Sequence, residues 1–469
     1  MPTPSPLLDS VSQTDSFSAR EVFFDLFDGQ ACDCELENAS RFLSAQLEHA
    51  ARLDSDLPRE MEGLYAWMEA NGAEVGRRYK AYLEARKAGG ARRYFSTKSH
   101  ALYFIKSVAP TKMVDGAWLY GLLDHWQDTR FSALIKTYLE ELGEGLPTKN
   151  HVVLYQKLLA SQGCERWDDL SDVNYVQGAI QLALAYGAER FLPEVIGFNL
   201  GYEQLPLHLL ITAYELKELG IDPYYFTLHI TVDNSDSGHA KKAVDAIFDA
   251  IPKLGDADEF YRRVCNGYKL NFLGANTNSV IESFDLEREM IAIFARKSVV
   301  GQFAHSDYRQ VAGRTVNEWL SDPSQTADFI AAMEAEGWFK RHQDPQSSRF
   351  WKLIQGEKAK MFGVFNAYEQ QVIYDWIAGD VVEEFTGAAR GPRLSLETKH
   401  SLFQAADSQA ARPPGDNDFD AEVRILERSL TSAVNQEDAM SKLIALMSPA
   451  QHHTPPGLMA TRIFNDVLG

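Results

Sequence analysis

Apolar residues recur every three or four positions along most of the chain, with polar residues between them. One such run contains Phe42, Leu43, Leu47, Ala50 and Leu53. This spacing predicts amphipathic α-helices. Similar patterns cover residues 61–68, 112–126, 131–142, 173–187, 193–219, 310–320, 327–336, 368–377 and 422–447. Alternating strand patterns with Asn-Gly or Asp-Gly turns are scarce, so we predict an all-α fold.

Polar, Gly- and Pro-bearing breaks divide the chain. Residues 1–18 are rich in Pro, Ser and Thr, which predicts a mobile tail. After a polar break, Ser279-x-x-Glu282 has the form of a capping box that starts a new helix. We therefore expect one helical-bundle domain over residues 19–275. A mainly helical C-terminal region should follow over residues 279–469, with a polar linker near residues 405–420.

Composition and charge narrow the class of protein. The 469 residues carry a net charge of −20 at pH 7. Nucleic acids and anionic membranes attract basic surfaces, so neither is expected as a partner. No apolar run approaches the ~18 residues of a membrane span, and the first residues lack the basic and apolar blocks of a signal peptide. The four cysteines form no disulfide framework, which favours reduced thiols and a cytoplasmic protein.

The strongest chemical signal lies in the sequence YYFTLHITVDNSDSGHA. In a helix with ~100° per residue, His229, Asp233 and Asp236 lie within roughly 60° on one face, together with an aromatic ring. An imidazole and two carboxylates on such a face indicate a metal site. His239 would lie roughly 80° from His229 in a regular helix. The Asn, Ser and Gly residues before it are weak helix formers that permit a local distortion.

Two further places bring carboxylate and imidazole groups into helical segments. Glu203 lies in an apolar run, and a buried carboxylate needs a cation, a proton or a metal. A surface position beside the Pro206 kink is the alternative for Glu203. Glutamates at 140, 141 and 144 precede His151, which taken alone is typical of a capping or core histidine. Helices that each bring one such group inward are how dinuclear iron sites are built in bundles.

Three segments together resemble a known family: LEELGEGLPTKNHVVLYQKLL, GYEQLP and YYFTLHITVDNSDSGHA. They are similar to the motifs of the haem-oxygenase-like diiron oxidases and oxygenases, often labelled iron-containing redox enzymes. The resemblance covers roughly residues 110–245. It implies a haem-oxygenase-like helical bundle that holds two iron ions, or one iron and one manganese ion, and uses O2 as co-substrate.

The resemblance also implies a ligand set. The matching positions are Glu141, His151, Glu203, His229, Asp233 and His239, with Glu144 and Asp236 as alternates. The chain departs from the family pattern His-x-x-x-Asp-x-x-His at its end, where the second His falls on Asp236. A histidine appears three residues later. We favour His239 as the ligand, because imidazole is the commoner metal ligand and Gly238 weakens the helix where a bend is required.

The function implied by the resemblance is that of a non-haem diiron, O2-dependent oxidase or oxygenase. Its substrate would be a small molecule of the amine, amino acid or fatty acid type. An external electron donor and a homodimeric state are additional hypotheses. Two alternatives stay open, a cofactorless helical enzyme or small-ligand-binding protein of the same fold, and a helical interaction protein with these groups on its surface.

Overall fold

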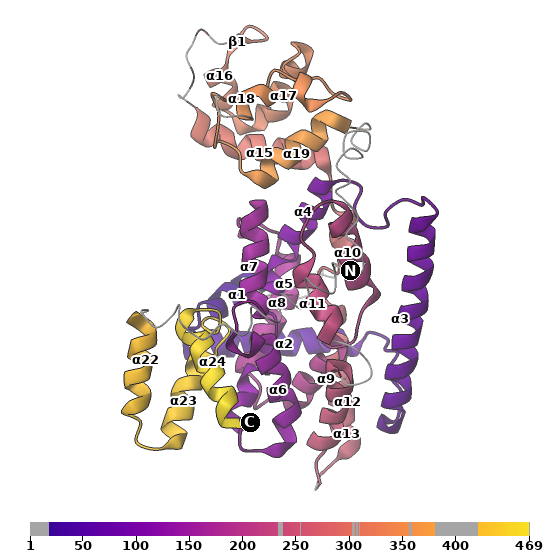
Figure 1. The fold of residues 1–469 in the computed structure, drawn as a ribbon, viewed down its shortest axis with the longest axis vertical. Helices are drawn as coiled ribbons and strands as arrows, with labels where there is room; N and C mark the ends of the chain where they lie inside the picture. The colour runs from indigo at the N-terminus through magenta and orange to yellow at the C-terminus, as the bar shows by residue number, and fades with distance from the viewer. Residues whose placement is uncertain are drawn as a thin grey trace, which may run out of the picture.

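Figure 1 shows the computed structural model, which describes residues 18–232, 238–253, 255–302, 305, 308, 310–355, 359–379 and 421–468. Within these residues the secondary structure is almost entirely helical. The single sheet found there is a hairpin of β1 (Gln310–Val311) and β2 (Arg314–Thr315). The predicted all-α fold is therefore confirmed.

The larger body is a helical bundle built from the helices between residues 19 and 282 (Figure 1). Its α-helices are α1 (Ala19–Phe27), α2 (Asp33–Ala51), α3 (Leu64–Lys87), α4 (Lys98–Ser107), α5 (Ala109–Lys112), α6 (Ser132–Glu141), α7 (His151–Gln162), α8 (Asp172–Tyr186), α9 (Leu192–Tyr202), α10 (Leu207–Glu218), α11 (Tyr224–Val232), α12 (His239–Ala250), α13 (Ala257–Lys269) and α14 (Thr277–Glu282). Short 3₁₀ helices are η1 (Met61–Gly63), η2 (Ala117–His125), η3 (Thr129–Phe131), η4 (Gly143–Gly145) and η5 (Leu270–Phe272).

Helices α9 and α13 cross at close range inside the bundle. A Cβ atom at Gly197 would overlap the carbonyl oxygen of Val264, and one at Gly267 would overlap the backbone of Glu194. Only glycine fits at these two positions. The closely packed α9 is thus a firm support for the residue that follows it, Glu203.

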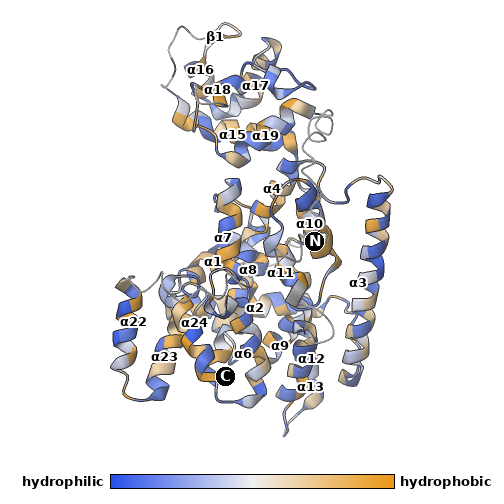
Figure 2. Ribbon diagram, viewed as in Figure 1, coloured by the Kyte–Doolittle hydropathy of each residue, from blue (hydrophilic) through white to orange (hydrophobic). Residues whose placement is uncertain are grey.

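At the edge of the bundle stands α3, and Figure 2 shows hydrophilic residues along much of its length.

A smaller lobe stands above the bundle in Figure 1. It contains the hairpin, α15 (Leu286–Gly301), α16 (Val316–Leu320), α17 (Thr326–Ala335), α18 (Trp351–Ile354), α19 (Ala367–Ala378), η6 (Pro323–Gln325) and η7 (Pro345–Ser347). Its buried residues form one apolar cluster with residues of α4, α7, α10 and α11. The lobe and this side of the bundle therefore share a core.

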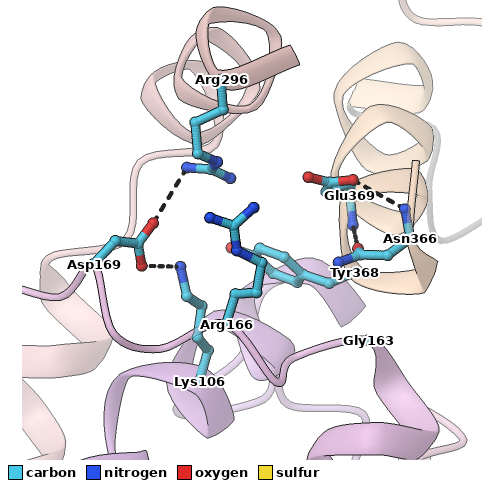
Figure 3. A pocket seen from close by; sticks show the side chains of 8 residues that line it. All are labelled: Lys106, Gly163, Arg166, Asp169, Arg296, Asn366, Tyr368 and Glu369. Carbon is cyan, nitrogen blue, oxygen red and sulfur yellow. Dashed lines mark hydrogen bonds and ion pairs between the residues drawn. The ribbon is translucent and has the colours of Figure 1, made fainter. Parts of the chain in front are cut away.

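Polar contacts also join the lobe to the bundle (Figure 3). Asp169, in the loop between α7 and α8, lies 2.9 Å from Lys106 Nζ and 3.6 Å from Arg296 Nη1. Buried Asp375 of α19 accepts a 2.8 Å hydrogen bond from the backbone N–H of Ser99 in the first turn of α4. These contacts place α15 and α19 against the bundle.

The last helices pack against the bundle, away from the lobe (Figure 1). They are α22 (Ala421–Thr431), α23 (Gln436–Leu446) and α24 (Pro455–Leu468). Leu426, Leu443 and Phe464 belong to the same apolar cluster as α1, α2, α6, α8 and α9. The expected C-terminal region over residues 279–469 thus occupies two separate places. Residues 1–17 and the expected linker near residues 405–420 lie outside the described residues, and the domain boundaries stay predictions.

Two predicted helices begin or end differently in the structure. The pattern over residues 112–126 contains only the last residue of α5, followed by the 3₁₀ helix η2, because Gly116 before η2 adopts a left-handed φ of 83°. The pattern over residues 310–320 starts with the β-hairpin, whose turn uses positive φ at Ala312 (49°) and Gly313 (74°). Both differences arise at residues in left-handed conformations, which the hydrophobic pattern does not reveal.

Capping side chains explain the remaining differences. The capping box starts at Asn276 and not at Ser279, and the helix stops after Glu282. Asp285 then caps α15. The single helix expected over residues 422–447 is divided into α22 and α23, because the side chain of Asn435 accepts a hydrogen bond at the start of α23.

The structure also bears on the thiols and on membrane spans. Cys32 and Cys34 are joined by a disulfide, whereas Cys164 and Cys265 are free. The expectation of reduced thiols is therefore wrong for the first pair. Among the described helices, none has the length and apolar character needed to cross a membrane.

Candidate metal centre

Titratable side chains from six segments meet in the interior of the bundle. Asp115 precedes η2, Glu141 ends α6, His151 begins α7, Glu203 follows α9, His229 lies on α11 and His239 begins α12. Each is at most 4% exposed. Residues beside Glu141 and Glu203 belong to one apolar cluster, whereas those beside His151 and His229 belong to the other. The polar centre therefore lies where the two apolar cores meet.

Four of these side chains form a first group, Asp115, Glu141, His151 and His229. Their potential ligand atoms lie within 4.8 Å of one another. Asp115 Oδ2 is 3.0 Å from His229 Nε2 and 3.7 Å from His151 Nδ1. His151 Nδ1 and Glu141 Oε2 are 2.5 Å apart, but neither atom has a partner in hydrogen-bond geometry among the described residues. Two buried polar atoms that face each other in this way suit a shared cation.

A second group consists of Glu141, Glu203 and His239, again within 4.8 Å. His239 Nδ1 lies 2.9 Å from Glu203 Oε2 and 3.7 Å from Glu141 Oε1. Glu141 therefore belongs to both groups, with Oε2 towards the first and Oε1 towards the second. A carboxylate that offers one oxygen to each of two neighbouring groups could serve both groups at once.

Neighbouring groups fix the orientation of two imidazoles. His229 Nδ1 donates to the carbonyl oxygen of Tyr225 at 2.9 Å, which leaves Nε2 for the first group. His239 Nε2 lies 2.7 Å from Glu140 Oε2, which leaves Nδ1 for the second group. Lys242 Nζ in turn lies 2.6 Å from Glu140 Oε2. A carbonyl or carboxylate on the outer nitrogen is the usual support of a metal-binding histidine.

Asp115 is held by a ring of donors. The hydroxyls of Tyr202 and Tyr225 donate to its Oδ1 and Oδ2, respectively. Lys112 Nζ lies 3.5 Å from Oδ1 and donates to the hydroxyl of Tyr202 at 2.8 Å. Burial favours the neutral acid, but Lys112 and the two histidines outweigh it and hold the pKa of Asp115 well below 3.8. Asp115 is thus an ionised carboxylate with a fixed orientation.

The same charges act on the groups around it. Burial lowers the pKa of His151, but the carboxylates of Glu141 and Asp115 outweigh burial and raise it to about 10. Burial raises the pKa of Glu141, and the charge on His151 reverses that effect. Without a metal, the positive charge of protonated His151 offsets the negative charges of Glu141 and Asp115. A divalent cation on the same atoms would replace that proton.

The structure brings five of the sequence-predicted residues together, Glu141, His151, Glu203, His229 and His239. Glu144 stays apart, because its side chain is 44% exposed and lies 3.8 Å from Lys149. Asp233 and Asp236 lie outside the described residues. α11 ends at Val232 and α12 begins at His239, so His239 starts a helix of its own. The ligand roles of all these residues stay predictions.

Sequence reasoning missed Asp115 and the role of Glu140. Asp115 is the one charged residue in the apolar stretch MVDGAWLYGLL. The argument used for Glu203, that a carboxylate in an apolar run needs a counter-charge, would have found it. Glu140 and Glu141 are adjacent, so they point about 100° apart on α6. Only the packing of α12 shows which of the two faces inward.

Comparison with known proteins places the centre in a matched region. Residues 102–271 match the model of the family described as iron-containing redox enzyme, and this range contains every member of both groups. No curated protein and no solved structure matches the chain. The donor set of buried carboxylates and imidazoles fits iron, which readily takes both ligand types.

Proposed function

We propose that this oxidoreductase is a non-haem diiron enzyme that uses O2, because residues 102–271 match the model of the family described as iron-containing redox enzyme. The observation that carries the proposal is the sharing of Glu141 between two groups of buried ligands. A mononuclear site would need only the first group. The second group, with its own carboxylate and imidazole, supports a second ion.

Each residue has a distinct place in this proposal. Asp115, His151 and His229 would hold one ion, and Glu203 and His239 would hold the other, with Glu141 between them. Two ferrous ions would supply the electrons that reduce O2 and would leave coordination positions open for it. The protein would hold these ligands away from bulk solvent, since all six side chains are almost completely buried.

The surroundings of Asp115 determine its role. Burial and the neighbouring carboxylate raise the pKa of Tyr202 and Tyr225 well above 10, so both phenols keep their protons and donate to Asp115. With these bonds and the Lys112 ammonium in place, Asp115 cannot rotate away from the first group without losing several hydrogen bonds. We propose that this ring keeps the ligand oriented while substrate and O2 enter.

The substrate class is a proposal that rests on the family resemblance. It is a small organic molecule of the amine, amino acid or fatty acid type, oxidised with O2 as co-substrate. An external electron donor, a homodimeric state and a cytoplasmic location are further proposals of the same kind.

Metal analysis tests the proposed function directly. The full-length protein would be stripped of metal, loaded with ferrous iron without oxygen, and freed of excess ion. We expect about two iron ions per chain and consumption of O2 when air is admitted. Iron binding at background level would overturn the proposal and favour the cofactorless alternative of the same fold. A Glu144→Ala variant, changed on an exposed side chain beside the site, should match the wild type.

A further inference from the structure

The loop between Glu141 and His151 connects two members of the first group. It contains three consecutive residues with left-handed backbone, Gly143 (φ 63°), Glu144 (φ 53°) and Gly145 (φ 77°). Two of these are glycines, the residue type with the greatest backbone freedom in the unfolded chain. Such a loop does not by itself fix the distance between the ligands at its two ends.

Asn150 closes this loop from inside. Its Nδ2 donates to the carbonyl oxygen of Leu142 at 3.1 Å, and its Oδ1 accepts from the backbone N–H of Val153 at 3.0 Å. One side chain therefore ties the end of α6 to the start of α7. Asn150 is completely buried, so each of its polar atoms needs a partner.

The last part of the chain supplies the remaining support. Asn150 Nδ2 also lies 3.1 Å from Nδ1 of His452, which is 2% exposed. An amide NH2 can only donate, so Nδ1 of His452 is the acceptor. The partners are 302 positions apart in the sequence. His452 also lies outside residues 102–271, the range that matches the family model.

Three other contacts join the same segments. Tyr138, one turn before Glu141, donates to the carbonyl oxygen of Met447 at 2.6 Å. Arg462 Nη1 donates to the carbonyl oxygen of Gly145 at 3.2 Å. A Cβ atom at Gly145 would overlap the carbonyl oxygen of Leu458, so the loop lies directly against α24. Together with the contact between His452 and Asn150, these contacts reach the last turn of α6, the loop and the residue that caps α7.

We propose that Met447, His452, Leu458 and Arg462 form a C-terminal clamp that positions Glu141 and His151 for metal binding. Within it, His452 is a positioning residue that acts through Asn150. The part of this proposal that concerns metal rests on the proposed function, whereas the ordering of the loop does not. Outer residues that orient metal ligands typically change metal affinity by 10–100-fold when they are replaced.

The test compares variants of the full-length protein. His452→Leu removes the acceptor for Asn150, and His452→Gln keeps an amide oxygen that can accept. Arg462→Met removes the bond to Gly145 from a half-buried position, where the fold is expected to tolerate it. Met440→Ala is the matched control, because it creates a cavity where α23 meets the bundle core, at a buried residue outside the four clamp residues.

Hydrogen exchange of the metal-free protein is the first measurement. We expect the amides of residues 143–153 to exchange about tenfold faster in His452→Leu and Arg462→Met than in wild type. His452→Gln should lie close to wild type, and Met440→Ala should not loosen this loop selectively. Unchanged exchange in both His452→Leu and Arg462→Met, or equal loosening in Met440→Ala, would overturn the clamp.

Anaerobic titration with ferrous iron is the second measurement. We expect about tenfold weaker binding at the more tightly binding position in His452→Leu, with rescue in His452→Gln. Equal affinity in wild type and His452→Leu, despite a loosened loop, would overturn the positioning role. If wild type itself bound no iron, the proposed function would fail, whereas the exchange result would still decide whether the clamp orders the loop.

Discussion

The two groups of candidate ligands share Glu141 but differ in their surroundings. The first group has two histidines and is enclosed by aromatic rings, with the imidazoles of His151 and His229 4.3 Å apart between ring centroids. The second group reaches the edge of the bundle, because the side chains of Glu140 and Lys242 behind His239 are each 24% exposed. Charge interactions are weaker where water has access. We therefore expect the first position to bind its ion more tightly and the second to exchange its ion faster.

Loss of the shared ligand should have the largest effect. Replacing Glu141 by Ala removes an oxygen from both groups, so iron should fall from about two ions per chain to well below one. Far-ultraviolet circular dichroism should remain helical, which separates this loss from unfolding. Retention of one full ion would show that Glu141 serves a single position.

Loss of an unshared histidine should remove one ion only. His229→Ala should abolish the first position and His239→Ala the second, each leaving about one ion per chain. His100→Ala is the buried control, since His100 stacks on Phe284 away from the centre. Metal analysis after anaerobic loading distinguishes these results. Complete metal loss in both histidine variants would mean that the two positions fill only together.

A smaller effect is expected from Glu140. Glu140→Gln keeps the size of the side chain but removes the charge that faces His239 Nε2 and Lys242. Affinity at the second position should fall about tenfold, whereas the first should be unchanged. Competition with a metal-sensitive dye would measure both constants. An equal drop at both positions would contradict the separate support of the two groups.

The smallest effect concerns pH and the metal-free protein. The pKa of His151 is raised from 6.5 to about 10 in the fold, so its proton stabilises the fold fully below about pH 6.5. That contribution is lost as the pH rises towards 10. The Tm of the metal-free protein should therefore decline over this range more than that of the iron-loaded protein, in which the ion replaces the proton. This difference in the decline of Tm should disappear in His151→Gln. If it persisted in that variant, a group other than His151 would be responsible for it.

Much of the fold was predictable because helix periodicity survives in the sequence. Pro206 was expected to kink one helix over residues 193–219, whereas it separates α9 from α10. The β-hairpin was not foreseen, because its turn relies on a left-handed Ala312. The division between α22 and α23 depends on one capping asparagine. A left-handed turn residue or a capping side chain can end a helix although the hydrophobic pattern continues.

The residues of the candidate site were predictable where a sequence motif contains them. They were unpredictable where contacts between distant segments of the chain bring them together. Glu203 stood out as a carboxylate in an apolar run, and His229 as an imidazole beside aromatic rings. Asp115 was overlooked because the pattern over residues 112–126 predicted a regular helix there, whereas Asp115 lies in a connection between two short helices. His452 could not have been linked to Asn150, because their contact spans 302 positions and has no local signal.

The central claim is that one glutamate joins two metal positions, and magnetic coupling tests it most directly. Wild-type protein loaded with manganous ions would be examined by electron paramagnetic resonance during a stepwise titration. We predict a single-ion spectrum at low loading that changes to an exchange-coupled pair near about two ions per chain. His239→Ala should stop at the single-ion spectrum. Two ions per chain without coupling, or saturation of wild type at one ion, would contradict the account.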